Sequence, residues 1–64
     1  MSAATILTIL SIVSSLFGVV KDAPAVIDEI KSLLAKVAPH VDGANAEVKR
    51  AFENAQAKLK ELGQ

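Results

Sequence analysis

The chain has 64 residues, no cysteine and one histidine, and its seven basic side chains balance seven acidic ones. This length allows one domain at most, and a soluble fold of this size buries only about 60% of the surface of its unfolded chain. Without cysteine there are no disulfides and no thiolate metal sites, and the balanced charge disfavours a nucleic-acid partner. A chain this small usually needs a further source of stability, and the one that remains is association with copies of itself, with another protein or with lipid.

The charged residues divide the chain in two. Residues 1–20 carry no charged side chain, and every Asp, Glu, Lys and Arg lies between Lys21 and Glu61. We interpret residues 1–64 as a single small helical unit, with a hydrophobic assembly or membrane helix in 1–20 and a charged amphipathic helical hairpin in 21–64. The predicted fold class is all-α.

The apolar residues of the first segment are too dense for the alternation of a strand, and the run is too long for one buried strand. A helix over about 3–20 is the better prediction, because the small and hydroxyl-bearing residues fall on one helical stripe. Small residues let a partner helix approach closely, so we interpret this stripe as a self-association face. It consists of Ala4, Thr8, Ser11, Ser15 and Gly18.

A second, amphipathic helix is predicted over about 23–38. Asp22 followed by Pro24 reads as an N-cap with proline in the first turn, where its missing N–H costs nothing. Pro39 is expected to end this helix, because the residue ahead of a proline is pushed out of the helical region. Whether the first and second helices are continuous is left open, since a proline also occurs in kinked helices.

A third helix is predicted over about 44–62, with Asp42 as its N-cap and Gly63 at the position that follows its end. The apolar faces of the second and third helices are expected to pack as an antiparallel pair. Such a pair buries little, so it needs the first helix or a neighbouring molecule to close the core. The predicted packing residues are Ile30, Leu33, Val37, Val48, Phe52, Ala55 and Leu59.

The first helix is consistent with two interpretations. As a membrane span, its 18 residues from Ala3 to Val20 reach roughly 27 Å, near the lower end for a hydrocarbon core of about 30 Å. As the buried helix of a water-soluble assembly, it would turn the stripe toward solvent or a lumen. A solvent-exposed helix face of this length normally carries charge, which disfavours the water-soluble interpretation. Six Ser or Thr residues between Ser2 and Ser15 and the absence of Trp and Tyr disfavour a membrane span.

No nucleophile, base and orienting group can be proposed together, so an enzyme is the least favoured class. His40 has no second histidine or cysteine nearby, and the neighbouring carboxylates Asp28 and Glu29 point in different directions on a helix. We therefore expect no catalytic residue, no metal site, no cofactor and no small-molecule substrate.

The leading hypothesis is a non-catalytic structural subunit that acts in multiple copies within a larger complex. Its first helix would mediate self-association or membrane insertion, and a small virion component of a bacteriophage or virus fits this general description. The alternatives are a permeabilising peptide of the holin or bacteriocin kind, which usually carries more positive charge, and a small regulatory protein with one membrane span. The expected partners are copies of the chain or other protein subunits, with a lipid bilayer as the competing partner. A membrane or a large particle is a better expectation for its location than the free cytoplasm.

Overall fold

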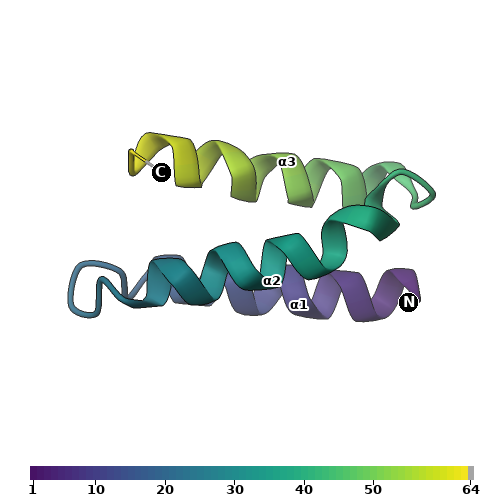
Figure 1. Cartoon of the computed structure of the whole chain (residues 1–64). Coiled ribbons are helices and arrows are strands. Elements are labelled where there is room, and N and C mark those ends of the chain that lie inside the picture. The colour runs from purple at the N-terminus through teal and green to yellow at the C-terminus, as the bar shows by residue number, and fades with distance from the viewer. Residues whose placement is uncertain (64) are drawn as a thin grey trace.

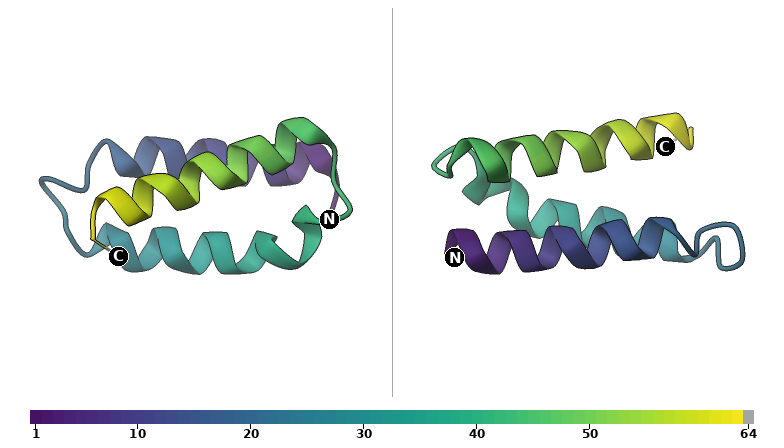
Figure 2. Two further views of the ribbon diagram at one scale, coloured as in Figure 1. Left: turned by 90° about the horizontal axis from the view of Figure 1, so that it is seen from above. Right: turned by 180° about the vertical axis from the view of Figure 1, so that it is seen from behind.

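The computed structural model describes residues 1–63, and within them the chain forms three α-helices and no strand. The helices are α1 (Ala3–Phe17), α2 (Val26–Val41) and α3 (Ala46–Glu61). Successive helices run in opposite directions, α1 and α2 lie side by side, and α3 lies across both of them (Figure 1 and Figure 2). The predicted all-α fold is confirmed, and the question of continuity is answered because a loop separates α1 from α2.

One hydrophobic core lies where the helices meet. From α1 it takes Ile6, Leu10 and Val13, which are spaced by four and three residues and therefore share one side of that helix. Each helix contacts both of the others, and the contacts of α2 with α3 are the least extensive. The first helix therefore closes the core of the hairpin. The buried core residues are Ile6, Leu10, Val13, Ile30, Leu34, Val37, Val41, Val48, Phe52 and Ala55.

The end of α1 differs from the prediction of a helix over about 3–20. The helix ends at Phe17, with Gly18 as its C-cap. The Gly18 N–H donates to the Ser15 carbonyl at 3.1 Å and the Val19 N–H donates to the Leu16 carbonyl at 3.0 Å, so the last turn tightens before the chain leaves the helix. Glycine is a weak helix former, and packing α2 antiparallel on α1 requires the chain to reverse here.

The start of α2 also lies later than predicted. Asp22 is not its N-cap and Pro24 is not in its first turn, because the helix begins at Val26 with Ala25 as a cap that makes no side-chain hydrogen bond. Pro24 lies in the preceding turn, where its carbonyl accepts from the Ile27 N–H at 3.1 Å. Nearer to α1, the Val19 carbonyl accepts hydrogen bonds from the N–H groups of Asp22 and Ala23 in the same loop.

The predicted end of the second helix at 38 is wrong, because Pro39 lies inside α2, which continues to Val41. A proline inside a helix leaves the carbonyl four residues earlier without its donor and bends the helix. That carbonyl belongs to Ala35, which is an exposed residue. The last turn of α2 bends toward α3 (Figure 1), and Val41 in that turn is buried. Burial of this valine offsets the cost of the proline.

The N-cap of α3 is Asn45 and not the predicted Asp42. The Asn45 side-chain oxygen accepts from the Val48 N–H at 3.0 Å, whereas Asp42 is the C-cap of α2. The later cap follows from the later end of α2, and α3 accordingly begins at Ala46. At the other end, Gly63 has φ +83°, the left-handed conformation that was expected at this position.

Truncation of the observed cap tests its position. We expect Asn45→Ala to lower the free energy of unfolding by about 1 kcal/mol, because the Val48 N–H loses its acceptor. Asp42→Ala is the control, and its effect should be below about 0.5 kcal/mol. Urea unfolding followed by circular dichroism measures both variants, and a larger loss for Asp42→Ala would contradict the assigned cap.

Two isoleucines of α1 test the assignment of its buried side. Ile6 is 1% exposed and Ile12 is 48% exposed, on the same helix. We expect Ile6→Ala to cost about 3 kcal/mol of unfolding free energy, because it leaves a cavity in the core, and Ile12→Ala to cost less than about 1 kcal/mol. Chemical denaturation at low protein concentration measures both. Equal effects of the two substitutions would show that α1 does not pack as described.

Candidate interaction surface

The side of α1 that faces away from the core is exposed and carries no charged residue. We call it the α1 outer face and include the two exposed residues that directly follow the helix. In contrast, every acidic and basic residue lies in or next to α2 and α3, or in the loops. The α1 outer face consists of Ala4, Thr5, Thr8, Ser11, Ile12, Ser14, Ser15, Gly18 and Val19.

All five residues of the stripe that the sequence singled out lie on this face, and all five are exposed. The stripe is therefore turned away from the core and not toward α2 or α3. The Thr8 hydroxyl donates to the Ala4 carbonyl at 2.9 Å, within its own helix. The Ser2 hydroxyl accepts from the Thr5 N–H at 3.2 Å and caps the start of α1. These hydroxyls support the helix locally and leave its outer surface uncharged.

A second line of exposed residues runs along the α1 outer face beside the stripe. Thr5, Ile12 and Val19 are spaced by seven residues, about two helical turns, and so lie close to one line along α1. The exposed fractions are 48% for Ile12 and 43% for Val19. The sequence alone does not separate these two exposed apolar residues from the buried apolar residues of α1.

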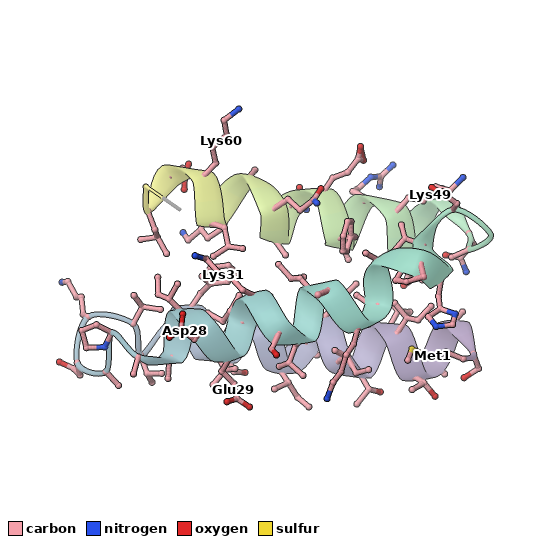
Figure 3. All side chains as sticks on the ribbon, in the orientation of Figure 1. Met1, Asp28, Glu29, Lys31, Lys49 and Lys60 are labelled. Atoms are coloured by element: carbon pink, nitrogen blue, oxygen red, sulfur yellow. The ribbon has the colours of Figure 1, made fainter. Side chains whose placement is uncertain are left out.

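A shallow apolar groove lies between α1 and α2. Its volume is about 610 Å³ and its lining is predominantly apolar. Glu29 is the one charged residue among the described residues that line it. The Glu29 side chain points away from α3 (Figure 3), so the groove opens on the side of the α1–α2 layer opposite α3. The lining residues are Ile12, Leu16, Ala25, Val26, Glu29 and Leu33.

The other flank of α1 borders a second groove, of about 530 Å³, against α3. Ala51 and Ala55 contribute small side chains from α3, and Ser11 and Ser14 contribute hydroxyls from α1. Asn54 and Lys58 also line this groove. The α1 outer face is thus a ridge with a groove on each side.

The predicted hairpin packing residues lie on the core side of their helices. Five of them are buried, namely Ile30, Val37, Val48, Phe52 and Ala55. Leu33 and Leu59 are partly buried and pack against the core. Leu33 also lines the α1–α2 groove, so it contributes to both the core and the surface.

The titratable side chains lie on the surface. His40 is exposed in the last turn of α2, and Asp28 and Glu29 are exposed in its first turn, where negative charge complements the helix dipole. Within residues 1–63, no three His, Cys, Asp or Glu side chains come together in a group that could hold a metal ion.

Over the described part of the chain, no helix combines the length and the apolar character that crossing a bilayer requires. Comparison with known proteins finds no matching family model, no matching curated protein and no matching solved structure. The surface of α1 and its two grooves therefore carry the functional interpretation.

Proposed function

We propose that this chain is a non-catalytic assembly subunit that associates with further copies of itself through the α1 outer face. The observation that carries the proposal is the lack of any charged residue on a surface that spans α1 and is exposed to solvent. Exposed helix surfaces of soluble proteins normally mix charges of both signs, as the outer surface of α3 does with Glu47, Lys49, Arg50 and Glu53.

A contact between copies suits this face better than a contact with a charged partner. The chain has net charge zero, so two copies do not repel each other at long range. An uncharged face against the same face buries no unpaired charge, which would cost several kcal/mol. Its polar groups are mainly hydroxyls, which donate and accept and so can pair with the same groups of another copy.

The area that a stable interface requires is a modest part of the surface of this chain. A stable protein–protein interface buries about 800 Å² of each partner, roughly a fifth of the 4177 Å² that this chain exposes. Association of this kind supplies the additional burial that a chain of this length lacks as a monomer.

Self-association is favoured over membrane insertion because of what α1 already buries. Ile6, Leu10 and Val13 are 1%, 4% and 0% exposed within the core. A lipid-facing α1 would have to withdraw these side chains and open the core that α2 and α3 share with it. Contact with another copy uses only side chains that the fold leaves exposed.

A carboxylate placed on the face tests the proposal. We expect Ser11→Glu to raise the dissociation constant of self-association at least about tenfold, equivalent to about 1.4 kcal/mol, because the new charge would be buried between copies. Sedimentation equilibrium of the purified chain over a range of concentrations measures this constant.

Ala57→Glu is the matched control, since Ala57 is an exposed small residue on α3 and the substitution adds the same charge. Its dissociation constant should stay close to that of the unmodified chain. Circular dichroism confirms that both variants keep their helices. A chain that remains monomeric at the highest concentration, or a Ser11→Glu variant that associates as tightly as the control, would refute the proposal.

A further inference from the structure

We propose that two copies of this chain pack with their α1 helices parallel, each α1 lying in the α1–α2 groove of the other copy. This inference rests on the proposed function and specifies the geometry of the contact. The α1–α2 groove is the receptor, and the ridge of α1 is the inserted element. Both belong to the same chain, so the contact is reciprocal.

The groove and the ridge have matching character. One wall of the groove carries Ile12 and Leu16 from α1, and the other carries Val26 and Leu33 from α2. The ridge presents Ile12, Val19 and small or hydroxyl-bearing residues, with no charge. Helices pack by fitting the side-chain ridges of one into the grooves of another, and an uncharged ridge is what an apolar groove accommodates without an unpaired charge.

Reciprocal insertion fixes the direction of the helices. If the two-fold axis runs parallel to α1, each α1 lies between α1 and α2 of the other copy, and both grooves are filled. If the axis runs across the helices, α1 faces α1 and α2 faces α2 with the directions reversed, and both grooves stay empty. An isologous contact that fills both grooves therefore requires parallel α1 helices.

Among the described residues that line the groove, Glu29 alone is charged, and the parallel arrangement brings hydrogen-bond donors to its carboxylate. It lines the groove together with Ile12 and Leu16, so it lies at the level of the last half of α1. In the parallel arrangement, α2 of the second copy runs along the stripe flank of α1, where the Ser11 and Ser15 hydroxyls lie at that level and can donate to the carboxylate.

The stripe acquires a role in this arrangement. It lies on the flank of α1 that the groove does not use, and it consists of Ala4, Thr8, Ser11, Ser15 and Gly18. Small side chains allow the backbone of a neighbouring helix to come close. The α1 outer face is thus covered on both flanks, by α1 of the second copy on the Ile12 side and by α2 of the second copy on the stripe side.

Disulfide trapping tests the direction, because the chain has no cysteine of its own. Thr5→Cys and Val19→Cys place single thiols at opposite ends of the ridge, roughly 20 Å apart along the helix. A disulfide forms only when the two Cα atoms lie within about 7 Å of each other. Each full-length variant is oxidised alone and in an equal mixture of the two, and covalent dimers are counted by mass spectrometry. Ala57→Cys, exposed on α3, is the control for random collision.

Parallel α1 helices predict that each variant forms its own covalent dimer about tenfold faster than the control, because association holds like positions together at high effective concentration. A disulfide that forms mainly between Thr5→Cys and Val19→Cys would show antiparallel helices and overturn the inference. Covalent dimers from only one of the two variants would show that the helices cross. No dimers above the control would show that the copies meet through another surface. Either result would overturn the inference. Sedimentation of the unmodified chain then separates the two claims, since self-association without these disulfides would leave the proposed function standing.

Discussion

Burial of one side of α1 between α2 and α3 is the interaction on which the rest of the structure depends. The facing surface of α3 is narrow and contains Ala51 and Ala55, so α2 and α3 alone would enclose little apolar volume. Ile6, Leu10 and Val13 supply the missing side chains and lie at most 4% exposed. At about 1.5–3 kcal/mol for each large aliphatic side chain removed from water, these residues contribute a sum comparable to the whole stability of a domain this small.

The helical periodicity predicted three segments and the inward side of the two charged ones, and both follow from local patterns. In α2 and α3 the charged residues mark the solvent side, so the opposite stripe had to be apolar and inward. The predicted helix boundaries were wrong at Pro24 and Pro39, because both prolines were interpreted from the local sequence only. Pro24 was placed in the first turn of a helix, and Pro39 was expected to end it. At Pro39 tertiary packing outweighs the local preference, because α2 continues to Val41 and the Val41 side chain is buried in the core. That gain depends on α1 and α3 and is absent from the sequence around the proline.

The surface of α1 was predictable in composition but not in orientation. The stripe from Ala4 to Gly18 could be read from spacing, but without a charged residue on the helix the sequence did not decide whether the stripe faces solvent or a partner helix. The buried Leu10 and the exposed Ile12 differ only in their angle around the helix. The two grooves could not be predicted at all, because each is made jointly by side chains of two helices and depends on how those helices pack.

The same side chains cannot serve both the core and a lipid bilayer, and this restricts how the uncharged helix is used. As long as Ile6 and Val13 are buried, α1 offers its surroundings only hydroxyls, small side chains and the exposed Ile12 and Val19. Such a surface is too polar to gain much from hydrocarbon and too poor in charge to be optimal in water. Another protein surface with the same mixture satisfies both requirements, because hydroxyls pair with hydroxyls while the aliphatic groups are removed from water. Folding of the monomer thus leaves exposed the face that we propose for assembly.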